Sequence, residues 1–198
     1  MTGSKAMKTT IPLFPLNTVL FPGGVLPLRI FEPRYLDMVS QCLRTDCGIG
    51  VVLIQQGQEV GKAAETFNVG TLCKIRYWNR RPDGMLGVTL EGEQRFSILS
   101  RQVNRDQSIQ AEVELLPEII GGSLAESRQY LARILDNILS QLEPPYSTMQ
   151  KQLDDEEWVA SRLIELLPLD MEVKQRLLSV ENASQKLAEV ASVLKQQS

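Results

Sequence analysis

Hydrophobic positions follow two different patterns along the chain, and Gly121-Gly122 marks the change between them. Before these glycines, short apolar runs are separated by Gly, Pro and Asp, which is typical of strands and turns. After them, apolar residues recur every three or four positions, which predicts helices that each bury one face. We therefore expect a β-rich domain over residues 1–122 and an α-helical bundle over residues 123–198.

The first part predicts a closed or nearly closed β-barrel of mixed topology with one inserted helix. Pro22, Gly23, Gly24 and Pro27 break the apolar segment 18–28 into short strands, and Asp83-Gly84 is a strong hairpin signal. Further strands are expected over residues 48–54, 70–78, 85–90, 95–100 and 109–116. The inserted helix begins near a proline and has one apolar stripe, made of Tyr35, Met38, Val39, Cys42 and Leu43.

The second part predicts four helices joined by short linkers, which together form a small bundle. Residues 123–126, with Ser first and Glu last, fit a reciprocal capping box, so the first helix is expected to begin there and to end before Pro144-Pro145. Asp154 is expected to cap the second helix and Asp170 a short third one. The last helix is expected over residues 183–195. The fold class is therefore α+β.

Composition removes most catalytic possibilities. The 198 residues include no histidine, so catalytic triads that use an imidazole base are excluded. The three cysteines, Cys42, Cys47 and Cys73, contain no C-x-x-C pair, and we expect reduced thiols with neither a disulfide framework nor a zinc site. We expect no metal, no cofactor and no enzymatic activity.

Charge and hydropathy restrict the partners. The net charge is −3, and residues 1–122 hold 13 basic and 12 acidic residues, so no general field attracts nucleic acid or an anionic membrane. No apolar run is long enough to span a bilayer, and the first ten residues lack the apolar core of a secretory signal. We expect a cytoplasmic protein.

One polar segment, residues 74–81, leaves two interpretations open. Strict alternation in a strand places Lys74, Arg76, Trp78 and Arg80 on one face, with Ile75 and Tyr77 on the other. A cationic face with an aromatic ring fits RNA, and Arg76, Trp78, Arg80 and Arg81 are the candidate contacts for this alternative. The other interpretation is an ordinary solvated surface, which the small charge of this half favours.

Apolar residues near the N-terminus exceed the expected needs of a core. Prolines between them leave carbonyl groups without paired amides, and this suits a sheet edge that receives an extended peptide. Core packing is the alternative for these side chains, which are Phe14, Leu16, Leu20, Phe21, Leu26 and Leu28.

The same region carries a family resemblance. The Phe-Pro-Leu block at 14–16 and the Phe-Glu-Pro-Arg-Tyr block at 31–35 resemble the opening of the N-terminal substrate-recognition domain of Lon proteases. Segments 69–75, 92–96 and 166–178 extend the similarity over nearly the whole chain. Glu32 and Arg34 in the second block are interpreted first as residues that hold the fold, because a helix begins between them.

The resemblance implies a PUA-like barrel followed by a helical bundle, and a role in engaging polypeptides. Full-length Lon continues into an ATPase and a Ser-Lys protease, whereas this sequence contains neither and resembles stand-alone Lon-domain proteins. The leading hypothesis is a non-catalytic module that binds unfolded or extended segments of client proteins. The candidate contacts are Phe14, Phe21, Tyr35 and Trp78. The sequence specifies neither the client nor the oligomeric state.

Overall fold

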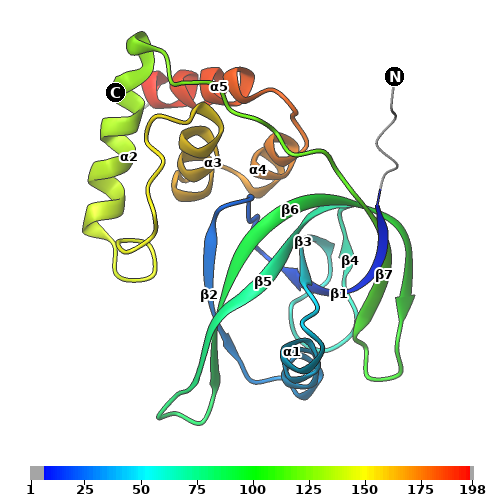
Figure 1. The fold of residues 1–198 in the computed structure, drawn as a ribbon. Helices are drawn as coiled ribbons and strands as arrows, with labels where there is room; N and C mark the ends of the chain where they lie inside the picture. The colour runs from blue at the N-terminus through cyan, green and yellow to red at the C-terminus, as the bar shows by residue number, and fades with distance from the viewer. Residues whose placement is uncertain (1–6, 197–198) are drawn as a thin grey trace.

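The computed structural model describes residues 7–196 and has an α+β fold. Helices α2 to α5 gather on one side of a strongly curved sheet, and α1 lies at the opposite end (Figure 1). The predicted α+β class is therefore confirmed. The strands are β1 (Lys8–Leu16), β2 (Val25–Ile30), β3 (Ile49–Gln56), β4 (Glu65–Thr66), β5 (Val69–Arg80), β6 (Leu86–Val103) and β7 (Ile109–Leu115).

The seven-stranded sheet closes on itself. Its order is β1-β7-β6-β5-β3-β4, and β1 also pairs in parallel with β3, which completes the barrel. The other pairings are antiparallel, so the predicted mixed topology is present. Only glycine fits at positions 50 and 70 inside the barrel. A Cβ at Gly50 would lie 2.9 Å from the ring of Phe96, and one at Gly70 would lie 2.7 Å from the same ring.

The strand β6 differs from the sequence prediction, which divided it into 85–90 and 95–100. It is one continuous strand, and Gly92 lies within it rather than in a turn. The glycine is needed because the backbone of the 21–24 loop approaches closely: Gly92 N–H donates to Gly24 O at 2.9 Å, and Gly23 N–H donates to Gly92 O at 2.8 Å. A Gly in a strand marks close backbone approach as well as a turn.

The first half of β6 projects with two neighbours as a small sheet that we call the arm. It consists of β2, residues 86–91 of β6 and residues 74–80 of β5. The predicted Asp83-Gly84 hairpin joins β5 to β6, and Gly84 has the positive φ of 84° that such a turn requires. Helix α1 (Pro33–Thr45) packs its buried stripe against the same core cluster as the arm.

The helices form the predicted bundle, with α2 (Gln129–Gln141), α3 (Glu156–Leu166), α4 (Met171–Leu178) and α5 (Ala183–Gln196). Their apolar faces share one core cluster with Phe21 and Leu53 of the β-rich half. The strands end before residue 122 and these helices begin after it. A division into separate domains at 122/123 stays a prediction.

The predicted capping box is wrong. A short 3₁₀ turn over Glu126–Arg128 precedes α2, and no side chain caps it. Ser123 instead bridges Asp155, while Leu124 N–H donates to Asp154 O at 2.7 Å and Glu156 N–H donates to Gly122 O at 3.0 Å. The segment is held extended by these bonds, so its backbone does not enter a helix at residue 123.

The cap of α3 gives a matched test. Asp155, not the expected Asp154, is the N-cap, and its carboxylate accepts the Trp158 N–H at 2.7 Å. We expect Asp155→Ala to lower the free energy of unfolding by about 1 kcal/mol, since a capping side chain is lost. Asp154→Ala keeps the backbone carbonyl that Leu124 uses, and its effect is expected to be smaller. Urea unfolding of both variants measures the difference, and equal losses would contradict the assignment.

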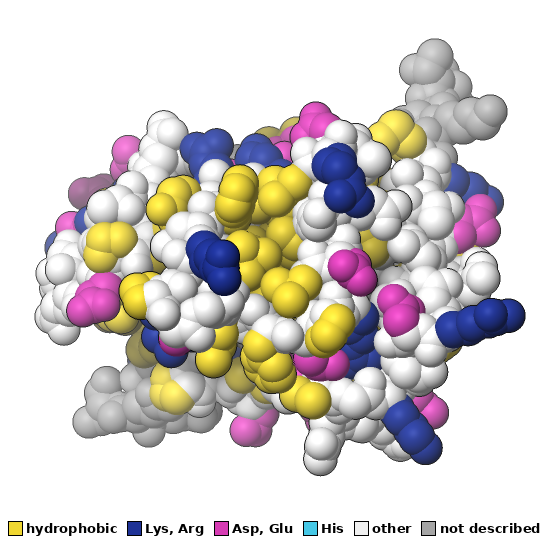
Figure 2. Space-filling view, turned by 90° about the horizontal axis from the view of Figure 1, so that it is seen from below, with side chains coloured by type: hydrophobic (Ala, Val, Ile, Leu, Met, Phe, Trp, Pro, Cys, Tyr) yellow, Lys and Arg dark blue, Asp and Glu magenta, His cyan; other side chains and the backbone are white. Residues whose placement is uncertain are grey.

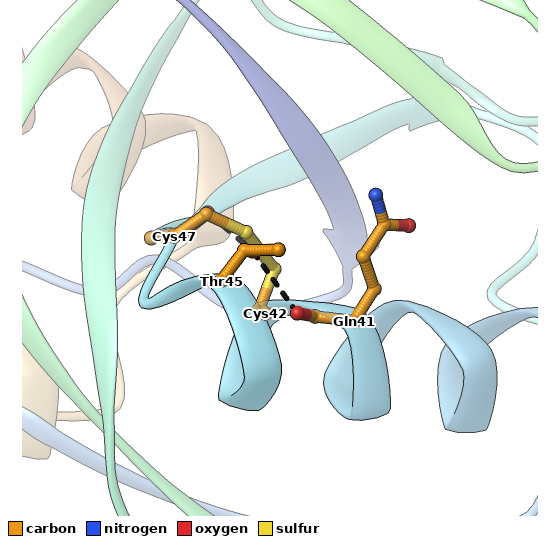
Figure 3. The surroundings of a disulfide bond; sticks show 5 residues. Gln41, Cys42, Thr45 and Cys47 are labelled. Atoms are coloured by element: carbon orange, nitrogen blue, oxygen red, sulfur yellow. Dashed lines mark hydrogen bonds between the residues drawn. A yellow bond between two sulfur atoms is a disulfide. The ribbon is translucent and has the colours of Figure 1, made fainter.

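The prediction of reduced thiols is wrong for Cys42 and Cys47, which form a disulfide. Asp46 at the end of α1 has the positive φ of 52°, and this left-handed turn brings the two Cα atoms within 4.6 Å. Figure 3 shows the bridge beside Thr45, whose hydroxyl donates to Gln41 O at 3.0 Å. Cys73 is free and buried.

A bidentate ion pair joins α4 to α5. Arg176 donates to both carboxylate oxygens of Glu189, at 2.6 and 3.1 Å, and this hydrogen bonding lowers the pKa of Glu189. Because the pKa is lower in the folded state, the pair stabilises fully above the ordinary carboxyl pKa and is lost as pH falls through the folded value.

The pair therefore predicts a pH-dependent difference in stability. We expect Glu189→Gln to cost about 0.5–1 kcal/mol at neutral pH, since the pair is partly exposed, and to cost progressively less in acid. Urea unfolding at a series of pH values measures this, with Glu143→Gln, an exposed carboxylate of the same bundle, as control. A difference that stays constant into acid would contradict it.

Candidate functional site

Three of the four predicted client contacts are core residues. Phe14 and Tyr35 are each 5 % exposed, and their rings stack with centroids 4.3 Å apart. Phe21 is fully buried at the seam between the barrel and the bundle. We therefore correct their assignment as surface contacts: these aromatic rings fill the interior. Arg34 holds the fold as expected, because it is buried and donates to the carbonyls of Gln107 and Glu59.

Trp78 is the one predicted contact at the surface, with 55 % of its area exposed. The predicted alternation fails beside it, because β5 changes register between Ile75 and Tyr77 and leaves Arg76 as an extra residue. Tyr77 consequently pairs with Thr89, and Trp78 pairs with the buried Val88. The bulge therefore places Trp78 in the same row as apolar core residues and moves Tyr77 to the outer face.

Carboxylates pair with three of the cations in residues 74–81. Lys74 is 2.9 Å from Glu93, and Arg76 is 3.2 Å from the Glu91 carboxylate. Arg81 lies 3.4 Å from Asp83 in the hairpin. Arg76 and Trp78 are separated by the bulge, and Arg80 pairs in register with Leu86. The predicted face of Arg76, Trp78, Arg80 and Arg81 is therefore divided, and two of its three arginines, Arg76 and Arg81, pair with carboxylates.

The inner side of the arm carries an exposed apolar face. Register places Leu28, Val88 and Trp78 side by side across its three strands. Leu26, Leu28, Ile75 and Leu86 on this side are only partly buried against the barrel core. Figure 2 looks onto this end of the molecule, where apolar side chains gather at the centre. We call the set Leu26, Leu28, Ile75, Trp78 and Leu86 the apolar face.

The outer side of the arm is the floor of a cleft of about 680 Å³. Val25 and Pro27 of β2, with Tyr77 and Asn79 of β5, line it. The opposite wall is the linker between α2 and α3 together with Trp158. From this wall come Pro144, Pro145, Thr148, Met149, Gln150 and Gln152. No sequence pattern marks these residues as part of a site, because only the fold brings this linker over the arm.

A buried ion pair of α3 holds this helix against residues 21 and 22, which precede β2 of the arm. Arg162 and Glu165 of α3 pair at 2.7 Å, Glu165 accepts the Phe21 N–H at 2.7 Å, and Arg162 donates to Pro22 O at 3.2 Å. Burial raises the pKa of the Glu165 carboxyl, and the neighbouring Arg162 guanidinium opposes that rise. A Cβ at Gly24 would lie 2.9 Å from Arg162 Nη2, so this position needs glycine.

Similarity to known proteins covers nearly the whole chain. Residues 10–196 match the family model of the ATP-dependent protease La (LON) substrate-binding domain. The chain is 34% identical to a Lon protease of Cytophaga hutchinsonii over 56% of its length, and 24% identical to one of Buchnera aphidicola over 98% of its length. These matches cover 14% and 26% of the two relatives, so the chain spans about a quarter of their length or less.

Solved structures show a similar fold. The Lon N-terminal domain protein of Xanthomonas campestris is 32% identical, with a TM-score of 0.76 and coverage of 93% of this chain and 98% of that one. The N-terminal domain of a Lon protease of the Mycobacterium avium complex is 16% identical, with a TM-score of 0.62 and coverage of 93% and 97%, and supports the fold alone. Within residues 7–196, no helix has the length and apolarity to cross a membrane.

Proposed function

Because the chain belongs to the family of Lon substrate-binding domains, we propose that it binds unfolded or extended polypeptide segments of client proteins without cutting them. The observation that carries the proposal is the exposed apolar face beside the open cleft. Unfolded chains expose apolar side chains that a folded protein buries. Covering Trp78 and its leucine neighbours therefore supplies favourable free energy in proportion to the apolar area removed from water.

The expected affinity is modest. Only part of each side chain in the apolar face is exposed, and binding must also offset the ordering of a flexible client. A few well-packed aromatic and aliphatic contacts dominate such interfaces. This arrangement favours reversible binding of many different segments over tight recognition of one sequence.

The proposal treats the module as non-catalytic. The sequence has no histidine, and burial strongly raises the pKa of the Cys73 thiol, so this cysteine does not supply a reactive thiolate. Cys42 and Cys47 are joined to each other. The family model that matches is the substrate-binding domain, and we assign this chain neither the ATPase nor the protease activity of whole Lon. A cytoplasmic location belongs to the proposal as well.

RNA binding is the less favoured alternative, because carboxylates pair with Lys74, Arg76 and Arg81. It makes a distinct prediction, since contacts with phosphates weaken steeply as salt is added. Binding through the apolar face is expected to change little over the same salt range.

The test is fluorescence anisotropy with reduced, carboxymethylated lactalbumin, which cannot fold, and with native lactalbumin as control. We expect saturable binding of the unfolded form, little binding of the native form, and no new fragments after prolonged incubation without ATP. Equal binding of both forms would contradict the proposal. Cleavage of the unfolded form by the purified chain would overturn its non-catalytic part.

A further inference from the structure

The strand β2 has one unpaired edge. It pairs with β6 through residues 25–30, and among the described residues no other strand pairs with it. Pro27 and Arg29 on this strand are exposed. The cleft is lined by Val25, Pro27 and Leu28 in succession, so it follows the strand itself as well as the side chains that project from the sheet.

The phase of the hydrogen bonds shows which groups face this edge. Gly92 N–H donates to Gly24 O, which makes Val25 and Glu91 a pair without hydrogen bonds to each other. Alternation then turns the backbone groups of Leu26, Leu28 and Ile30 toward β6. The outward groups are therefore the N–H and C=O of Val25, the C=O of Pro27, and the N–H and C=O of Arg29.

Pro27 fits this phase. Its missing N–H falls on the open side, so the ladder to β6 loses nothing. The open edge therefore presents the carbonyl groups of Val25, Pro27 and Arg29, and the N–H groups of Val25 and Arg29. An extended chain presents complementary groups at the same spacing of two residues.

A chain added at this edge would touch both sides of the arm. Side chains alternate across a strand, so every second residue of the added strand would lie beside Leu26 and Leu28 of the apolar face. The residues between them would enter the cleft beside Val25 and Pro27, under the linker wall. The edge thus joins two surfaces that otherwise face opposite directions.

We propose that a client segment binds as an added β-strand along the free edge of β2, with alternate apolar residues on the apolar face. This inference rests on the proposed function and specifies its mode. The occupant is an extended polypeptide rather than a second copy of this chain. Antiparallel pairing of two β2 strands centred on Pro27 would oppose two prolines, and neither could donate to the other.

Amide hydrogen exchange with residue resolution tests the mode directly. The probe is a soluble peptide of alternating valine and threonine with lysine at both ends. We expect the Val25 and Arg29 amides to exchange quickly in the free protein and to become protected when the peptide binds. The Leu26 and Leu28 amides already donate to β6 and are expected to be protected in both states.

Two variants that have the same net charge test the hydrogen bond donated by the Arg29 N–H. Arg29→Pro removes the outward N–H, whereas Arg29→Ala removes only the side chain. We expect Arg29→Pro to bind the peptide about fivefold more weakly than Arg29→Ala, as the loss of one hydrogen bond predicts. Circular dichroism checks that both variants fold, and the exchange experiment on the unchanged protein decides the question if Arg29→Pro does not.

The failures are distinguishable. If peptide and unfolded lactalbumin bind but Val25 and Arg29 gain no protection, strand addition is overturned and the proposed function stands. If neither ligand binds, both are overturned. Protection of Val25 and Arg29 without peptide that increases with protein concentration would identify a second copy as the occupant and overturn the proposal.

Discussion

Replacing Arg162 by methionine is expected to lower the free energy of unfolding by about 3–5 kcal/mol, which is among the largest effects of any single change in this chain. The arginine is 1 % exposed, and its partner Glu165 is enclosed by the seam between barrel and bundle. Removing the cation leaves a buried carboxylate without its charge partner. It also removes the hydrogen bond to Pro22 O and the contact of the guanidinium with the Trp158 ring.

The double variant separates charge from packing. Glu165→Gln keeps an oxygen that can accept the Phe21 N–H, and combined with Arg162→Met it leaves no buried charge in the pair. We expect the double variant to recover much of the stability lost in Arg162→Met, because replacing a whole buried pair is far less costly than breaking it. Urea unfolding of the four proteins completes the cycle. A double variant no more stable than Arg162→Met would show that the pair does not act through charge.

This seam also sets the shape of the candidate site. Gly23 and Trp158 both line the cleft, and Arg162, on the same helix as Trp158, donates to the Pro22 carbonyl of the 21–24 loop. A partly detached bundle would move the linker wall away from the arm. We therefore expect Arg162→Met to weaken binding in the cleft as well as folding, whereas changes in the apolar face should affect binding alone.

Local patterns predicted the elements well, because the forces that determine them act between near neighbours in the chain. Three- and four-residue spacing located α2 to α5, and Asp83-Gly84 located the hairpin, since each signal is complete within a few residues. The family resemblance extended this to the whole fold. The errors in the elements occur where distant backbone intervenes, as at Gly92 and at Ser123.

The site was predicted less well, because exposure is a property of the folded molecule. Phe14 and Trp78 are both aromatic residues in strands, yet the first stacks on Tyr35 and is buried, whereas the second is 55 % exposed, and a one-residue bulge turns it onto the side of the arm that carries the apolar face. In the sequence, the bulged residue Arg76 is followed by Tyr77 and Trp78, and no other local pattern marks the bulge. The linker wall of the cleft is separated from the arm by more than fifty residues of sequence, so no local pattern joins them.

Replacing Trp78 by alanine is expected to reduce affinity for unfolded lactalbumin about tenfold or more, with a change in stability within about 1 kcal/mol. The indole is more than half exposed, so the fold depends little on it, while the apolar face loses its largest side chain. Anisotropy titration measures the affinity. Leu99→Ala is the matched control, because Leu99 is 45 % exposed on the same strand β6 but lies beyond the arm.

Tyr77→Ala completes the test, because Tyr77 is adjacent in sequence and 60 % exposed, yet lines the cleft on the other side of the arm. If the apolar face alone captures clients, only Trp78→Ala weakens binding. If a client adds along β2 and alternates its side chains between the two sides, both variants weaken binding while Leu99→Ala does not. Equal and small effects of all three would contradict the arm as the site, since a surface that binds by burying apolar area must lose affinity when its largest rings are removed.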